Sequence, residues 1–315
     1  MRDETPARLE YFREANEYLG DVDRLNALFN EDGYLFFRGV LEGVEDVKVD
    51  FVEVLQQQGA VPAGASDPLW TGLDNDHIND TGLYEAPSLA KLFTLPHNVE
   101  LIQQILGEPV FIFKSPSIRY ALPNDLAYVT PPHQDYFFIR FNESFRTLWV
   151  PLMEIDEQVG GLVLAGGVHK RGLLDHKEQE NAYSYIFKGR KQKGIALDSV
   201  PQPWLTAHYH SGDLLMFHNL MIHWALPNRS NRIRLSVDVR CQPANAPRTW
   251  QAEKSILEAR RFRETAKRIA TEEGATEEVF EALIIELMRR DLEPERLQIR
   301  SLISELSSTE ELRPN

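Results

Sequence analysis

SGDLLMFHNLMIHWALPNRSNRIRLSVDVRCQP, residues 211–243, is the stretch that decides the fold. An apolar run at 214–217 predicts a strand that leads towards His223, and turn residues at 227–231 separate it from a further strand. In that further strand aliphatic and polar side chains alternate, which places them on opposite faces. The polar face carries Arg232, Arg234, Ser236, Asp238 and Arg240. A polar row facing the inside of a β-barrel or β-sandwich indicates a site.

The segment PPHQDYFFIRF, residues 131–141, places His133 and Asp135 two residues apart. On a β-strand such residues point to the same side, so we expect one cation to bind both. A second, distant histidine, His223, would complete a facial triad with open positions, which suits Fe(II) and leaves room for a co-substrate and O₂.

An arginine on the polar face of the last strand could pair bidentately with the far carboxylate of a 2-oxo diacid whose near end chelates the metal. Strand alternation permits Arg232, Arg234 or Arg240 in this role.

The composition limits the other possibilities. A chain of 315 residues with 43% hydrophobic residues can bury one large core, so we expect one catalytic domain with appendages. The formal charge of −14 disfavours nucleic acid and anionic membranes as partners. The single cysteine, Cys241, excludes a Cys-based zinc site and fits a reducing compartment. The sequence shows no signal peptide and no long apolar stretch, so we expect a cytoplasmic enzyme with a small-molecule substrate.

The N-terminal part reads as helical over residues 1–60, with a strand at 34–41. Residues 60–90 are rich in Gly, Pro, Asn and Asp, which predicts a long loop. Loops of this length often act as lids over active sites, so Trp70 and Asn75 are candidate substrate contacts.

A helical pattern over 89–110 is followed, from 111 to about 243, by short apolar runs between Gly, Pro and Asn, which predict the strands of the core. We therefore expect a β-rich catalytic domain over 1–249. Residues 250–315 are charged and almost free of strand signals, and they predict two or three amphipathic helices. These helices would pack on the domain or form a homodimer with a partner subunit.

Four stretches, in order over residues 25–245, resemble the phytanoyl-CoA dioxygenase family of Fe(II)- and 2-oxoglutarate-dependent oxygenases. They are EDGYLFFRGVL (31–41), HQD (133–135), LWVPLMEIDEQVGGLVLAGGVHKRG (148–172) and GDLLMFHNLMIHWALPNRSNRIR (212–234). In the third stretch Val168 replaces the usual Ser. The residues after 250 lie outside the resemblance.

The resemblance implies a mainly β fold with flanking helices, a double-stranded β-helix of the jelly-roll or cupin-like type. It implies that His133, Asp135 and His223 bind the metal. In the family an Arg eleven residues past the distal His anchors 2-oxoglutarate, which selects Arg234 here. The implied reaction is hydroxylation coupled to conversion of 2-oxoglutarate to succinate and CO₂. Related halogenases replace the ligand carboxylate, so Asp135 favours oxygen chemistry.

Further candidates surround these residues. Gln134 in similar enzymes can lie near 2-oxoglutarate, and Ser236 shares the face of Arg234 and could donate to the same carboxylate. Two hydroxyls on predicted strands, those of Tyr120 and Thr147, are further candidate contacts of 2-oxoglutarate; the alternative is a core hydroxyl that bonds to the backbone. Aromatic side chains next to the ligands could wall a substrate pocket, or fill the core: Tyr136, Phe138 and Trp224.

The predicted substrate is a specialised metabolite, an amino acid derivative or a sugar, because the strand region lacks the dense Lys/Arg run that would hold the phosphates of an acyl-CoA. Two alternatives come from other classes. One is a metal- and 2-oxoglutarate-binding sensor without turnover. The other is a redox-neutral zinc enzyme on the same scaffold, which would not need 2-oxoglutarate.

Overall fold

The computed structural model describes residues 8–139, 144–183, 191–200 and 203–307. The chain forms two compact units. The first comprises Met1–Ile112 and Pro116–Ala246, and the second comprises Phe113–Ser115 and Pro247–Asn315.

The first unit contains, in the described residues, two main sheets and a separate pair of strands. The larger sheet has the order β2-β10-β5-β12-β3, and β4 also pairs with β12: β2 (Tyr34–Phe37), β10 (Leu214–His218), β5 (Arg146–Pro151), β12 (Arg234–Pro243), β3 (Val110–Ile112) and β4 (Ser117–Ala121). The smaller sheet has the order β1-β9-β6-β11: β1 (Leu9–Tyr11), β9 (Trp204–Thr206), β6 (Leu162–Ala165) and β11 (His223–Ala225). The separate pair is β7 (Lys177–Tyr183) and β8 (Lys191–Gly194).

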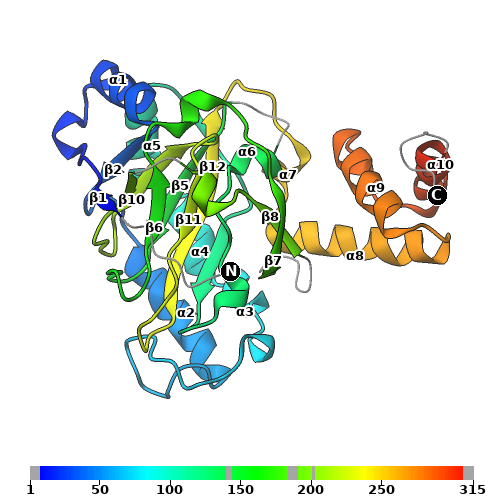
Figure 1. Ribbon diagram of the computed structural model, residues 1–315, viewed down its shortest axis with the longest axis horizontal. Coiled ribbons are helices and arrows are strands. Elements are labelled where there is room, and N and C mark those ends of the chain that lie inside the picture. The colour runs from blue at the N-terminus through cyan, green and yellow to red at the C-terminus, as the bar shows by residue number, and fades with distance from the viewer. Residues whose placement is uncertain (1–7, 140–143, 184–190, 201–202, 308–315) are drawn as a thin grey trace. The chain divides into compact units, whose positions relative to one another are not determined.

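Strand β12, yellow in Figure 1, organises the larger sheet because it has partners on both edges. Val237 lies opposite Val150 of β5 on one side and Ile118 of β4 on the other. The predicted alternation along this strand is present. Leu235 and Val239, like Val237, are completely buried on the aliphatic face, while the polar side chains between them face a pocket.

The N-terminal helices pack on this framework: α1 (Val22–Asp32), α2 (Val44–Gln57), α3 (Thr81–Tyr84), α4 (Pro87–Leu92) and α5 (Pro96–Leu106). Helix α1 begins where the Asp21 side chain accepts a hydrogen bond from the backbone of Arg24, and it buries Leu25, Leu28 and Phe29. It contacts β2 and α5, and α5 in turn contacts β3. The helical spacing predicted from the sequence is confirmed here.

The helical structure predicted for residues 1–60 is wrong over residues 9–19. Leu9–Tyr11 form β1, which pairs in parallel with β9, and only Asn16–Tyr18 form a short 3₁₀ turn. Leu9 packs on the apolar cluster of the smaller sheet. Pairing with a strand nearly two hundred residues away therefore overrides the local helical pattern.

The predicted long loop at 60–90 is shorter than expected. It contains the 3₁₀ turn Asn75–His77 and helix α3, and it runs into α4. Asn75, Ile78 and Leu83 are buried. This segment contributes no residue to the wall of the pocket described below, and its role as a lid stays a prediction.

The second unit is helical, as predicted: α7 (Trp250–Glu253), α8 (Ile256–Glu272), α9 (Glu277–Arg289) and α10 (Arg296–Ser307). A capping box of Ser255 and Glu258 begins α8. The helices share a core of their own that includes Phe262, Leu283 and Ile299. In the described part of the chain, no helix is both long enough and apolar enough to span a bilayer.

Candidate metal centre

Two histidines, 90 residues apart in sequence, face each other across a backbone bridge. The amide of His133 donates to the carbonyl of His223, and the amide of His223 donates to the carbonyl of His133, both at 3.0 Å. This is the hydrogen-bonded pair of an antiparallel ladder. The spacing of the two side chains is thereby set by the backbone.

Asp135 reaches the same centre by another route. It is the first residue of a helical turn, α6 (Asp135–Phe138), after Gln134 in an extended conformation. The predicted strand geometry of the HQD segment is therefore wrong at Asp135, although the expected convergence of the two side chains occurs. Thr147 and Arg240 hold the carboxylate from the neighbouring sheet.

The three side chains present their ligand atoms to one point. Asp135 Oδ1 lies 3.7 Å from His133 Nε2 and 3.8 Å from His223 Nε2, and the three candidate ligand atoms all lie within 4.8 Å of one another. Ligands bound at roughly 2.1 Å in cis positions lie about 3 Å apart, so a small contraction would enclose a metal ion. All three side chains are buried.

The ring orientations suit metal binding. The other ring nitrogen, Nδ1, lies 2.8 Å from the Pro131 carbonyl in His133 and 3.0 Å from the Met221 carbonyl in His223. Each carbonyl accepts the Nδ1 proton, which leaves the Nε2 lone pair directed at the centre.

The protonation states also suit metal binding. Burial raises the pKa of Asp135, but Arg240 and the two imidazoles outweigh this effect and hold that pKa well below its usual range. Burial, helped by the neighbouring His133, lowers the pKa of His223 to about 3. The centre therefore offers an ionised carboxylate and a neutral imidazole, the forms that bind metal ions.

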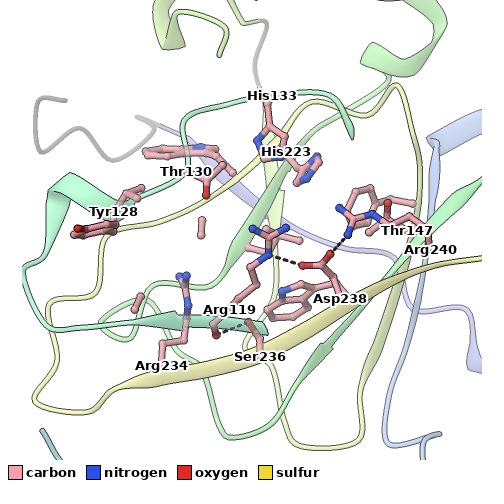
Figure 2. Close-up of a pocket in the computed structure, with 17 residues that line it drawn as sticks. Arg119, Tyr128, Thr130, His133, Thr147, His223, Arg234, Ser236, Asp238 and Arg240 are labelled. Atoms are coloured by element: carbon pink, nitrogen blue, oxygen red, sulfur yellow. Dashed lines mark hydrogen bonds and ion pairs between the residues drawn. The ribbon is translucent and has the colours of Figure 1, made fainter. Parts of the chain in front are cut away.

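A chain of charged side chains extends from Asp135 into the larger sheet. Figure 2 shows its part from Arg240 through Asp238 to Arg119. Arg240 donates through Nη2 to both oxygens of Asp135, each at 3.0 Å, and through Nη1 to Asp238. Asp238 also accepts from Arg119 Nε at 2.5 Å. The sequence placed Asp238 and Arg240 on the polar face of β12, but it gave no signal that Arg240 contacts Asp135. Arg119 was missed altogether.

A pocket beside the centre is lined by residues of both main sheets. Figure 2 shows polar side chains from β12 and β4 on one wall, with His133 and His223 above them. The lining residues are Arg119, Ala121, Tyr128, Val129, Thr130, His133, Thr147, Trp149, Leu162, Phe217, His223, Trp224, Ala225, Arg234, Ser236, Asp238 and Arg240. The stretch from Tyr128 to Thr130, just before the HQD segment, carries no sequence signal that predicted it.

Arg234, the predicted co-substrate anchor, lines this pocket and is buried. Its Nη1 donates to the carbonyl of Gly160 and, at 3.3 Å, to that of Leu226. Gly160 has a φ of 80°, and a Cβ there would meet the carbonyl oxygen of Leu226 at 2.4 Å. Only glycine permits this close approach, which builds the carbonyl cradle, Gly160 and Leu226, around the Arg234 guanidinium.

Of the other predicted site residues, Thr147, Ser236 and Trp224 line the pocket. Thr147 donates to Asp135 Oδ2 at 2.5 Å. Ser236 Oγ lies 3.5 Å from the carbonyl of Arg119.

The remaining predicted residues lie outside the pocket wall. The Gln134 amide donates to the carbonyls of two loop residues and accepts a third hydrogen bond, so it ties loops together behind the metal centre. Tyr120 donates to Asn75 at 3.0 Å, and the Trp70 indole donates to a neighbouring carbonyl. Tyr136 is half-buried, whereas Phe138 is 48% exposed and stands edge-on to His133.

Comparisons with known proteins agree with this geometry. The family model described as phytanoyl-CoA dioxygenase (PhyH) matches residues 29–236. A 1-deoxypentalenic acid 11-beta-hydroxylase of Streptomyces exfoliatus is 32% identical over 249 residues, which cover 74% of this chain and 86% of that protein.

Solved structures share the fold at lower identity. The non-heme monooxygenase ThoJ is 17% identical, with a TM-score of 0.52 over 71% of this chain and 79% of that one. The non-heme alpha ketoglutarate dependent carbocyclase SnoK from nogalamycin biosynthesis is 19% identical, with a TM-score of 0.51 over 77% and 90%. These likenesses confirm the predicted jelly-roll fold.

Proposed function

The chain belongs to the phytanoyl-CoA dioxygenase family, and from this membership we propose that it is an Fe(II)- and 2-oxoglutarate-dependent dioxygenase that hydroxylates a small molecule. The observation that carries the proposal is the buried group of His133, Asp135 and His223, whose ligand atoms lie within 4.8 Å of one another. Two imidazoles and one carboxylate on one side of an ion leave its other positions open, which is the ligand set of non-haem iron oxygenases.

In this proposal His133 and His223 bind the metal through Nε2 and Asp135 binds it through Oδ1. The backbone carbonyls of Pro131 and Met221 keep both imidazoles in the tautomer that this requires. When bound, Fe(II) with 2-oxoglutarate supplies O₂ activation coupled to decarboxylation to succinate and CO₂, with transfer of one oxygen atom to the substrate.

Arg234 is the proposed anchor for the far carboxylate of 2-oxoglutarate. It is buried in the pocket wall, and the carbonyl cradle fixes its guanidinium through Nη1. A planar guanidinium held in place on one side can pair with a carboxylate at small entropic cost. Ser236, on the same face of β12, is the proposed second donor to that carboxylate.

The proposed substrate is a small molecule with a largely apolar skeleton. The pocket lining includes apolar side chains, those of Val129, Leu162, Phe217 and Trp224, as well as the polar row of β12. Small-ligand pockets are lined mostly by apolar side chains with a few polar groups that fix orientation, and this lining matches that pattern. The strand region also lacks the dense Lys/Arg run that would hold the phosphates of an acyl-CoA. The Streptomyces relative is named for a reaction on 1-deoxypentalenic acid, and this favours a specialised metabolite over a sugar or an amino acid derivative.

The test is an anaerobic titration of the metal-free protein with Fe(II) and then 2-oxoglutarate, followed through the visible metal-to-ligand charge-transfer band. We expect the band in the wild-type protein, its loss in Asp135→Ala, and a much higher 2-oxoglutarate requirement in Arg234→Ala. Arg232→Ala is the matched control, because Arg232 lies two residues away and outside the pocket wall, and it should titrate like the wild type. Thermal melting of each variant distinguishes loss of the site from loss of the fold.

The outcomes separate the alternatives. Metal binding without the charge-transfer band would reject the oxygenase proposal and favour a zinc enzyme. A normal band without succinate release in air, across a panel of terpenoid and polyketide acids, would favour a sensor that binds metal and 2-oxoglutarate without turnover. Succinate release that one member of the panel stimulates would identify the substrate class.

A further inference from the structure

The two oxygens of the Asp135 carboxylate have different surroundings. Oδ1 faces the two imidazole nitrogens, at 3.7 and 3.8 Å. Oδ2 accepts a hydrogen bond from Thr147 Oγ1 at 2.5 Å. Arg240 Nη2 lies 3.0 Å from each oxygen. Oδ1 is therefore directed at the proposed metal position, Oδ2 is held by Thr147, and Arg240 contacts both oxygens.

The groups that hold this carboxylate come from adjacent positions on paired strands. Thr147 of β5 lies directly opposite Arg240 of β12. Arg240 is fixed in turn by Asp238 and by Ser117 Oγ at 3.2 Å. Thr147, Asp238 and Arg240 are all buried, and β5 is paired on both edges, with β10 and β12. The arrangement is rigid because each member has several partners inside one sheet.

We propose that Thr147 and Arg240 are positioning residues that form a carboxylate clamp, which restricts Asp135 to binding metal through one oxygen. The proposal rests on the proposed function, because it assumes that Asp135 is a metal ligand. It assigns Thr147 to the carboxylate and not to 2-oxoglutarate, to which the sequence had assigned it.

The clamp has a consequence for the open positions of the metal. A six-coordinate ion with three protein donors keeps three positions, of which a chelating 2-oxo acid takes two and O₂ needs one. If Oδ2 rotated towards the metal and also bound, one of these positions would be lost. The Thr147 hydroxyl prevents that rotation because Oδ2 would have to give up a short hydrogen bond. A hydrogen bond from a hydroxyl to a charged carboxylate is among the stronger hydrogen bonds in proteins.

Arg240 contributes charge as well as geometry. It is the first cation in the alternating chain Asp135, Arg240, Asp238 and Arg119. Because Arg240 partly neutralises Asp135, the metal keeps more of its charge for the dianionic co-substrate. Arg240→Lys keeps a cation beside Asp135 but loses the second guanidinium nitrogen, Nη1, which contacts Asp238 and Ser117, so it tests whether fixing the cation matters beyond its charge.

The test counts the waters on bound Mn(II), used as the probe ion, by water-proton relaxation, with no 2-oxoglutarate present. Thr147→Val replaces the hydroxyl with a methyl group of similar shape, and we expect one fewer metal-bound water and a 2-oxoglutarate dissociation constant raised about tenfold or more. Thr147→Ser restores the donor and should recover the water count. Thr206→Val is the matched control, because this buried threonine donates to the carbonyl of Leu162, away from the metal ligands.

The outcomes are distinguishable. If the wild type binds Mn(II) and the water count and 2-oxoglutarate affinity of Thr147→Val match those of the wild type and of Thr206→Val, the clamp is refuted while the proposed function stands. If the wild type binds no Mn(II), both fail. If Thr147→Val does not fold, Thr147→Ala gives the decision, because it removes the same hydroxyl donor. The clamp predicts a lower water count in this variant as well, and an unchanged count rejects the clamp.

Discussion

Gly160→Ala should weaken 2-oxoglutarate binding although Gly160 is not an expected contact of the co-substrate. Alanine at a φ of 80° costs about 1–2 kcal/mol. Its Cβ would also lie 2.4 Å from the Leu226 oxygen and 2.5 Å from the Pro227 oxygen, so this backbone must move. Overpacking of this kind costs about 1–3 kcal/mol, which gives a total of roughly 2–5 kcal/mol.

The movement displaces the carbonyl cradle, because the carbonyls of Gly160 and Leu226 are the acceptors for Arg234 Nη1. A misaligned hydrogen bond to a charged group loses about 1.5–3 kcal/mol, which raises the 2-oxoglutarate dissociation constant roughly ten- to hundredfold. Urea denaturation measures the stability term, and the charge-transfer titration measures the affinity term.

Gly167→Ala is the control that separates strain from collision. Gly167 has a φ of 69°, and a Cβ there would meet nothing within 4 Å. This variant should show the backbone cost alone, about 1–2 kcal/mol, with 2-oxoglutarate affinity unchanged. The reasoning is refuted if Gly160→Ala is as stable as Gly167→Ala, or if it binds 2-oxoglutarate as tightly as the wild type does.

Three further predictions concern stability. Leu283→Ala, in the core of the helical unit, should lower the free energy of unfolding by about 2–5 kcal/mol in urea denaturation. Ile285→Ala, at a position that is 54% exposed, should change this free energy by no more than about 0.5 kcal/mol. Equal effects of the two substitutions would contradict the assigned core. Burial lowers the pKa of His218 from 6.5 to about 4, so the unfolded chain binds the proton more tightly and stability should fall as the pH drops from about 6.5 towards 4. His218→Asn keeps an acceptor for the backbone N–H of Leu220, which now donates to His218 Nδ1. The difference between the urea midpoints at pH 7 and pH 5 should be smaller in this variant than in the wild type. An equal difference would contradict the assignment of this pH dependence to His218. Mn(II) at a hundred times its dissociation constant should stabilise the wild type by about 2.7 kcal/mol and raise its melting temperature. EDTA should reverse this rise, and His223→Ala should lack it. A similar rise in His223→Ala would mean that the ion binds elsewhere.

The parts of the site that the sequence predicted are those encoded by short-range periodicity. The alternation along β12 predicted which face of the strand carries Arg234, Ser236, Asp238 and Arg240, because a strand has a period of two residues whatever its partners are. The spacing in HQD predicted that His133 and Asp135 converge, although the local conformation at Asp135 is a helical turn.

What the sequence could not predict depends on partners that are distant in the chain. Arg240 and Asp135 are 105 residues apart, and no local pattern reports their contact. The same limit explains Leu9–Tyr11, where an edge position beside β9 decided the conformation against a helical pattern. Gln134 alternates away from the pocket, and its three hydrogen bonds could be assigned only once the loops around it were placed.

The paired amides and carbonyls of His133 and His223 also bear on how the molecule folds. The two residues are 90 positions apart, so their mutual bridge closes a large loop and belongs to the non-local pairings that form slowly. Until that bridge closes, the two imidazoles have no fixed separation, and a divalent ion would find no more than a flexible partial site. The time at which tight metal binding appears during refolding would therefore report when the jelly-roll closes. Tight binding should appear later than the N-terminal helices.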